Sequence, residues 1–209
     1  TEDRRVRTRT SVNCVAELSG DMQSGSHNLG GLAGFELYEN VNPDDLALKA
    51  AKIAVTMAKA DHAPSGRRPV IIDHGFGGVI FHEACGHGLE AAFIAKGTSV
   101  YTGLLGEKIA SDLVTAIDDG TLINGWGSGH VDDEGTPTQR NVLIEDGILK
   151  SYLVDRFNGK KLDMPSSGSG RRQSYKFAAT SRMSNTFIAP GNSKLEDMIS
   201  ETDYGLYAS

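Results

Sequence analysis

The feature that most constrains this chain is a pair of histidines, His82 and His87, which lie five residues apart with Glu83 directly after the first. Two imidazoles and a carboxylate this close together are the composition of a divalent-metal hydrolase site. In the common zinc-peptidase motif the two histidines lie about four residues apart on one helix face. Five residues turn a regular α-helix by about 500°, so the two side chains would diverge by about 140°. A straight helix therefore cannot direct both rings at one ion.

Two distortions would bring the rings together. The helix could contain a one-residue π-bulge between His82 and His87, a feature often found at functional sites, or it could break near Gly86. Gly86 and Gly88 make either departure inexpensive, because glycine tolerates backbone angles and close approaches that other residues resist. We favour the bulge, since residues 89–94 are still helix formers. The alternative is a packed helix that carries two unrelated histidines, but clusters of titratable groups favour a functional site.

The segment before the motif predicts a strand that leads into the motif helix. Residues 69–73 contain the apolar run Val70-Ile71-Ile72, which predicts a buried strand that brings His74 and Gly75 to the entrance of the motif helix. The glycines of residues 75–78 could suggest a phosphate cradle, but they lack both the lysine of a P-loop and the glycine spacing of a dinucleotide site. Their simpler role is to let the helix begin close to the sheet.

Several segments around the motif carry a further signal: residues 78–90, 96–100, 118–121, 132–137 and 141–147, Gly170-Arg171-Arg172, and Asn185-Thr186. In this order they resemble the TldD/PmbA family of metallopeptidases. The resemblance extends from about Ser24 to the last residue. Within the family, the sequence is similar to the TldD-type branch, which retains the metal motif. Several segments in order are far more specific than one motif.

The resemblance implies that His82 and His87 bind zinc and that Glu83 activates the metal-bound water, which attacks the amide carbonyl of short or unfolded peptides. It also implies a homodimer or a heterodimer with a related subunit. In that family the third zinc ligand is a cysteine in a segment that follows the match to residues 204–209. We therefore expect a fragment of a longer protein, and weak zinc binding by two histidines alone, because zinc sites normally use at least three protein ligands.

Composition sets the outer limits. The 209 residues are 39% hydrophobic and include 25 glycines, which suits a soluble, loop-rich α+β protein. The net charge of −6 argues against binding to nucleic acid. No apolar run approaches the ~20 residues of a membrane span. With only Cys14 and Cys85, a disulfide framework is not expected, and a reducing cytoplasm fits best.

The predicted fold is α+β, with largely antiparallel sheets on which an amphipathic helix and the metal-motif helix pack. Residues 1–95 form a strand-helix-strand-helix region that ends in the motif helix, and residues 96–209 form a mainly β region. The amphipathic helix spans residues 43–60, after a cap at Asn42. Two alternating apolar runs joined at Asp146-Gly147 predict a hairpin over residues 141–154.

Weaker patterns predict the remaining elements. They are a long edge strand with a solvated arginine face over residues 4–18, a loose strand within 20–34, strands at 113–117 and 186–189, a short helix at 156–162, and a final helix from Ser193.

Two segments outside the motif could contact a substrate. Arg171 and Arg172 could clamp a peptide carboxylate or an oxyanion, or they could pair with Asp132 or Asp133 as a structural contact. The glycine-rich loop around Trp126 could border a cleft for an extended peptide, or it could be an ordinary hairpin tip.

Two other function classes stay open. Cys85 could be a nucleophile activated by His82 or His87 in a metal-free acyl-transfer enzyme, although one shared helix gives poor geometry for this pairing. The chain could also be a noncatalytic subunit or partner-binding module of a two-subunit peptidase assembly.

Overall fold

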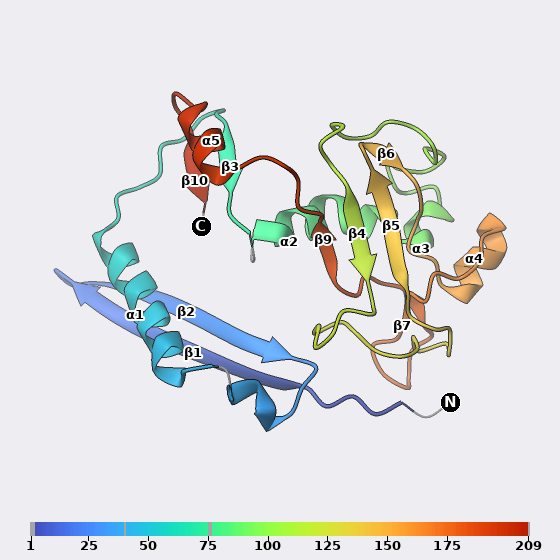
Figure 1. Ribbon diagram of the computed structural model, residues 1–209, viewed down its shortest axis with the longest axis horizontal. Helices are drawn as coiled ribbons and strands as arrows, with labels where there is room; N and C mark the ends of the chain where they lie inside the picture. Colours follow the sequence, from blue (N-terminus) through green and yellow to red (C-terminus); the bar gives the residue numbers. More distant parts are fainter. Residues whose placement is uncertain (1–2, 40, 75–76, 209) are drawn as a thin grey trace. The chain divides into compact units, whose positions relative to one another are not determined.

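The computed structural model describes residues 3–39, 41–74 and 77–208, and it contains both helices and largely antiparallel sheets, as the α+β prediction requires (Figure 1). The chain divides into two compact units. We call Arg4–Gly66 the hairpin unit and the second unit, formed mainly by Arg67–Ser209, the sheet unit. The domain boundary expected after residue 95 falls inside the sheet unit.

The hairpin unit is a two-stranded antiparallel sheet covered by one helix. Strands β1 (Thr8–Leu18) and β2 (Asp21–Gly31) are joined at a tight turn, and burial alternates along β1, which confirms the predicted two-faced strand. Helix α1 (Pro43–Lys59) packs against both strands. It approaches closely because β2 has Gly25 at the contact, where an added Cβ would lie 2.3 Å from a carbonyl oxygen of α1.

The sequence predicted α1 almost to the residue, because its signals are local. The Asn42 side chain accepts a hydrogen bond from the Asp44 backbone at 3.1 Å, and Pro43 occupies the first turn. The helix buries Leu46, Ala50 and Ala54 against the hairpin. A short 3-10 helix, η1 (Phe35–Tyr38), precedes it.

The sheet unit is organised on a four-stranded antiparallel sheet in the order β6-β5-β4-β9. Its strands are β4 (Ala116–Asp119), β5 (Arg140–Glu145), β6 (Ile148–Leu149) and β9 (Thr186–Ile188). Strands β5 and β6 form the predicted hairpin, with Asp146 and Gly147 both at positive φ in the turn. The strand expected at residues 113–117 is observed as β4, which begins at Ala116 and ends at Asp119.

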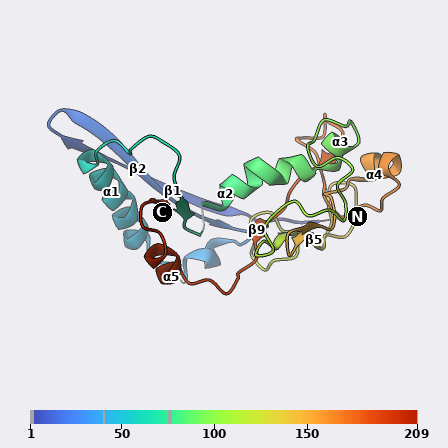
Figure 2. The same cartoon turned by 90° about the horizontal axis from the view of Figure 1, so that it is seen from above.

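The metal-motif segment runs along this sheet as a chain of short helical pieces, visible from above in Figure 2. They are α2 (Gly78–Phe81), η3 (His82–Gly86), η4 (His87–Leu89) and α3 (Ala91–Ile94). Both α2 and η3 contact β9. The buried core beneath them includes Phe81, Leu89 and Leu143. The packing of the motif segment on the sheet therefore fixes where its side chains lie.

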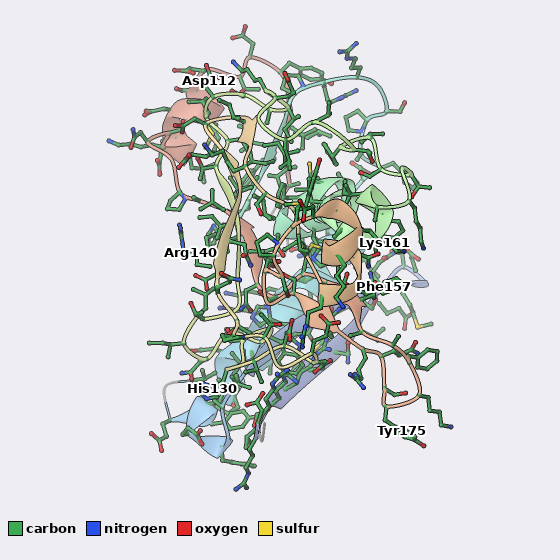
Figure 3. All side chains as sticks on the ribbon, turned by 90° about the vertical axis from the view of Figure 1, so that its right-hand side faces the viewer. Asp112, His130, Arg140, Phe157, Lys161 and Tyr175 are labelled. Atoms are coloured by element: carbon green, nitrogen blue, oxygen red, sulfur yellow. The ribbon has the colours of Figure 1, made fainter. Side chains whose placement is uncertain are left out.

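The remaining elements of the sheet unit are short. They are β3 (Val70–Ile72), α4 (Arg156–Leu162), β7 (Gly170–Arg171), β8 (Thr180–Ser181), α5 (Leu195–Ser200) and β10 (Leu206–Ala208). Helix α4 has the bounds that the sequence predicted. In Figure 3, Phe157 and Lys161 lie together on α4, and Tyr175 lies on the loop that joins β7 to β8. None of the helices within residues 3–39, 41–74 and 77–208 has both the length and the apolar composition of a membrane span.

The prediction of a buried strand at residues 69–73 is wrong. Strand β3 exists, but Val70 is 48% exposed and Ile72 is 39% exposed. Strand β3 pairs, in parallel, with β10 in a separate two-stranded sheet, and its residues are not part of the buried core that the four-stranded sheet carries. The apolar run predicted the position of the strand correctly, but it did not predict that the strand is exposed. Gly75, which we expected at the end of this segment, lies outside the described residues.

A group of buried polar side chains joins α4 to β8. We call it the Asp155 cluster; it consists of Asp155, Asn158, Ser167, Ser169 and Ser181. Asp155 caps α4 by accepting from the Asn158 backbone at 2.9 Å, and it also accepts from the Asn158 amide at 2.7 Å and from the Ser181 hydroxyl. A carboxylate without exposure is tolerated because each of these donors compensates for lost water.

The Asp155 cluster predicts that stability falls in acid. Burial alone raises the pKa of Asp155, but hydrogen bonds from Asn158 and Ser181 outweigh it, so the net pKa lies below the ordinary value of 3.8. A carboxyl with a lowered folded pKa stabilises the fold above its unfolded pKa, and this contribution is lost as pH falls through the folded value. We expect the free energy of unfolding, measured with urea, to be lower at pH 3 than at pH 7. Asp155→Asn should lower this free energy by about 1–3 kcal/mol at pH 7 and should make the difference between the two pH values smaller.

The matched control is Asp112→Asn, which removes an exposed carboxylate that pairs with Lys108. We expect this variant to keep the wild-type acid dependence. Equal acid dependence in wild type and Asp155→Asn would contradict the assignment to Asp155.

Candidate metal centre

The predicted π-bulge is present between the two motif histidines. Residues His82–Gly86 form a π-helical turn, in which the His87 backbone N–H donates to the His82 carbonyl five residues earlier. The wide turn absorbs the extra residue that a regular helix would place on another face. The two imidazole rings consequently meet, with centroids 4.8 Å apart and planes at 87°.

This turn gathers three groups that could hold a metal ion. Ligand atoms of His82, Glu83 and His87 all lie within 4.8 Å of one another. His87 Nε2 lies 3.8 Å from a carboxylate oxygen of Glu83. The two rings are half-buried, whereas Glu83 is exposed. Imidazole nitrogens suit zinc, and a carboxylate beside them can act as a further ligand or as a base, so the residues fit that ion.

The helix does not continue past the motif as expected, because it is interrupted at Glu90. This residue has extended backbone angles, φ −71° and ψ 127°, and forms a parallel bridge with Leu153. The Leu153 N–H donates to Leu89 at 2.9 Å, and the Ala91 N–H donates to Leu153 at 2.8 Å. Packing against Leu153 thus overrides the helix-forming tendency of residues 89–94, and only α3 restarts beyond the break.

The interruption turns Glu90 back toward the second histidine. Glu90 is only 1% exposed, and its Oε1 lies 2.8 Å from His87 Nδ1. Arg182 Nη1 donates to the other carboxylate oxygen at 2.9 Å. Sequence reasoning missed both residues. The interval of three from His87 to Glu90 was a usable signal for a contact, but nothing local marks Arg182.

Comparison with known proteins identifies the family. Residues 65–209 match the model of the PmbA/TldA metallopeptidase C-terminal domain, and residues 1–58 match that of the PmbA/TldA metallopeptidase central domain. The chain belongs to the PmbA/TldA metallopeptidase family. The resemblance inferred from the motifs is confirmed. Along the sequence, the gap between the two matched domains, residues 59–64, lies close to the end of the hairpin unit at Gly66.

Individual relatives agree with this assignment. The chain is 41% identical over 213 residues to the metalloprotease TldD homolog of Buchnera aphidicola, covering 99% of this chain and 44% of the relative. It is 31% identical over 157 residues to the zinc metalloprotease TldD homolog of Saccharolobus solfataricus, covering 75% and 35%. TldE from Thermococcus kodakarensis has the same fold, with a TM-score of 0.77 at 24% identity over 96% of this chain and 45% of that chain. The chain therefore spans less than half the length of each.

The glycines of this PmbA/TldA motif serve close packing. Gly86 has ordinary helical angles, φ −54° and ψ −49°, so of the two glycine properties expected to matter, close approach is the one that applies there. An added Cβ at Gly86 would lie 2.2 Å from the sulfur of Met183, and one at Gly88 would lie 2.8 Å from the Tyr101 ring. The motif helix needs these glycines because neighbouring side chains lie directly against it.

The structure does not favour Cys85 as a nucleophile in this PmbA/TldA chain. Its sulfur lies 2.8 Å from the Tyr101 hydroxyl. Burial, with a smaller contribution from this hydrogen bond, raises the pKa of Tyr101 to about 12, so the phenol keeps its proton and does not act as a base at neutral pH. His87 Nδ1, for its part, is bonded to Glu90. The thiol therefore has a phenol partner in place of the imidazole that a nucleophilic cysteine requires.

The arginine pair has structural contacts. Arg172 donates through its backbone to an Asp133 carboxylate oxygen at 2.9 Å and through its side chain to the Asp133 carbonyl at 3.0 Å. Arg171 donates to the Met183 carbonyl at 3.3 Å. Asp132 is buried and accepts a hydrogen bond from the Gly170 backbone at 2.8 Å. The contacts of Arg172 with Asp133 agree with the structural alternative, and a contact of this exposed pair with a substrate stays a prediction. Trp126 is 47% exposed, which leaves both interpretations of its loop open.

The π-helical turn predicts how insertions and deletions affect the site. Deleting the exposed Ala84 leaves an interval of four, which a regular helix places on one face, so we expect divalent-metal affinity to stay within about tenfold of wild type. Inserting a second alanine after Ala84 creates an interval of six, a rotation of about 600°, and should separate the rings. Titration with Co²⁺ and Zn²⁺ measures both. Equal affinity in the two variants would refute the role of the turn.

Proposed function

We propose that this chain carries the catalytic centre of a zinc-dependent peptidase, in which His82 and His87 bind zinc and Glu83 is the general base. The observation that carries the proposal is the π-helical turn that places ligand atoms of these three residues within 4.8 Å of one another. Membership of a metallopeptidase family supports it, as does the relative named a zinc metalloprotease.

The donor atoms define how zinc would be held. Because His87 Nδ1 is bonded to Glu90, the proposal assigns Nε2 to the metal. A zinc site normally has at least three protein ligands. The two histidines would supply two of these ligands. We propose that the third comes from outside the motif, as the family resemblance implies. Glu83 then stays unligated and available for proton transfer.

Peptide hydrolysis needs a nucleophile, an activated carbonyl and a proton carrier. When bound, zinc would polarise the scissile carbonyl and lower the pKa of a water molecule toward about 7. Glu83 is exposed beside the rings, so it can accept a proton from the attacking water and deliver it to the departing amine. Short or unfolded peptides are the proposed substrates, and a second, related subunit is the proposed partner.

Replacing the base tests the chemical step. We expect Glu83→Gln in the full-length protein to lower peptide hydrolysis by about 10²–10⁴-fold, while zinc content per chain stays at the wild-type level. Glu107→Gln, which changes an exposed glutamate outside the motif, is the matched control and should leave turnover unchanged. Hydrolysis by Glu83→Gln at the wild-type rate would overturn the assignment of Glu83 as the base, whereas a wild-type protein that binds zinc but hydrolyses no peptide would favour a noncatalytic subunit.

Replacing the ligands tests the metal. His82→Ala and His87→Ala should each remove one imidazole donor, so we expect zinc measured by elemental analysis to fall well below the wild-type stoichiometry after dialysis. His62→Ala changes an exposed histidine in the hairpin unit and should retain the wild-type stoichiometry. Wild-type zinc content in both motif variants would show that the ion binds elsewhere.

A further inference from the structure

We infer that Glu90 and Arg182 form a positioning pair, which fixes His87 as the tautomer with its proton on Nδ1 and thereby directs the Nε2 lone pair toward the metal. The part of this inference that concerns metal affinity rests on the proposed function. The part that concerns the tautomer rests on the geometry of the chain alone.

The contacts of Glu90 determine which ring nitrogen has the proton. Both carboxylate oxygens of Glu90 accept from Arg182 Nη1, so Oε1 is placed as an acceptor, and the 2.8 Å contact between Glu90 Oε1 and His87 Nδ1 points to a hydrogen on Nδ1. A neutral imidazole has one N–H, and its other nitrogen is then an unprotonated acceptor. In His87 that nitrogen is Nε2, the atom that faces Glu83 at 3.8 Å.

Arg182 pairs with the carboxylate of Glu90 in its buried position. Glu90 is 1% exposed, and a buried charge is costly unless it is paired and hydrogen-bonded. Arg182 Nη1 lies 2.9 Å from one oxygen of Glu90 and 3.3 Å from the other. One arginine nitrogen thus bridges the carboxylate, and Oε1 also faces the His87 ring.

Both partners are held by backbone contacts. The parallel bridge to Leu153 fixes the main chain on each side of Glu90. The Arg182 N–H donates to the Ser169 carbonyl at 2.8 Å. Next to it, the Ser181 hydroxyl accepts from the Ala92 N–H at 3.2 Å and donates to Asp155. The Asp155 cluster thus ties the start of α3 to β8, close to both residues of the pair.

A purely structural ion pair makes a different prediction. If Glu90 and Arg182 only joined α3 to β8, their loss would lower stability without changing the protonation of His87. The tautomer of His87 therefore separates positioning from stability. It is measurable in the metal-free protein, where zinc chemistry plays no part.

The experiment uses the full-length protein labelled with ¹⁵N-histidine and stripped of metal by a chelator. Long-range ¹H–¹⁵N spectra identify the protonated nitrogen of His87, with His87→Ala for assignment. We expect Nδ1–H in the wild type. In Glu90→Gln the amide can donate as well as accept, so we expect a mixture of tautomers. Glu145→Gln, which removes an exposed acid paired with Lys150 at 3.3 Å, is the matched control and should leave His87 unchanged.

Titration with Co²⁺ gives the second readout. Loss of an outer contact to a metal-binding histidine typically weakens metal affinity 10–100-fold, and we expect a reduction of about this size in Glu90→Gln and Arg182→Gln. Arg182→Lys keeps the positive charge and should recover part of the affinity. Circular dichroism verifies that each variant is folded.

The outcomes are distinct. An Nε2–H tautomer in the wild type would overturn the inference without the need for any variant. An unchanged tautomer in folded Glu90→Gln would overturn it as well. An Nδ1–H wild type that binds no zinc would refute the proposed function and still support the positioning role of Glu90.

Discussion

The candidate site depends on one backbone hydrogen bond, from the His87 N–H to the His82 carbonyl five residues earlier. In a regular helix this donor would pair with the carbonyl of Glu83, and the rings would point to different faces. The wide turn keeps the hydrogen-bonding direction of a helix but changes its rotation. The position of the imidazoles is therefore a property of the main chain, which side-chain rotation alone could not reproduce.

The surroundings of the turn determine how well it holds its shape. Met183 and the Tyr101 ring lie against the two motif glycines, where any side chain would collide with them. The bridge from Glu90 to Leu153 ends the helical segment immediately after the second histidine. The exposed side of the turn carries Glu83, and the buried side carries Glu90. Two carboxylates seven residues apart thus have opposite environments: Glu83 faces solvent, and Glu90 is buried between His87 and Arg182.

Local signals in the sequence predicted a large part of this arrangement. The interval between His82 and His87 required a distorted helix, and the cap at Asn42 and the Asp146-Gly147 turn marked elements that the structure contains. Contacts between distant residues could not be predicted in this way. Arg182 lies 92 residues from Glu90, and the helix break at Glu90 depends on Leu153 from another part of the chain. The exposure of β3 likewise depends on which strands surround it, and an apolar run contains no information about that.

The pairing of β3 with β10 has a consequence for how the chain acquires its structure. These strands come from opposite ends of the sheet unit, and Arg68 and Tyr204 beside them also bond across 136 residues of sequence. Contacts between such distant segments cost more loop-closure entropy and form slowly. During synthesis, which proceeds from the N-terminus, Val70–Ile72 leaves the ribosome long before its partner exists. For that interval it is an unpaired apolar strand, the kind of segment that chaperones bind and that associates with other nascent chains.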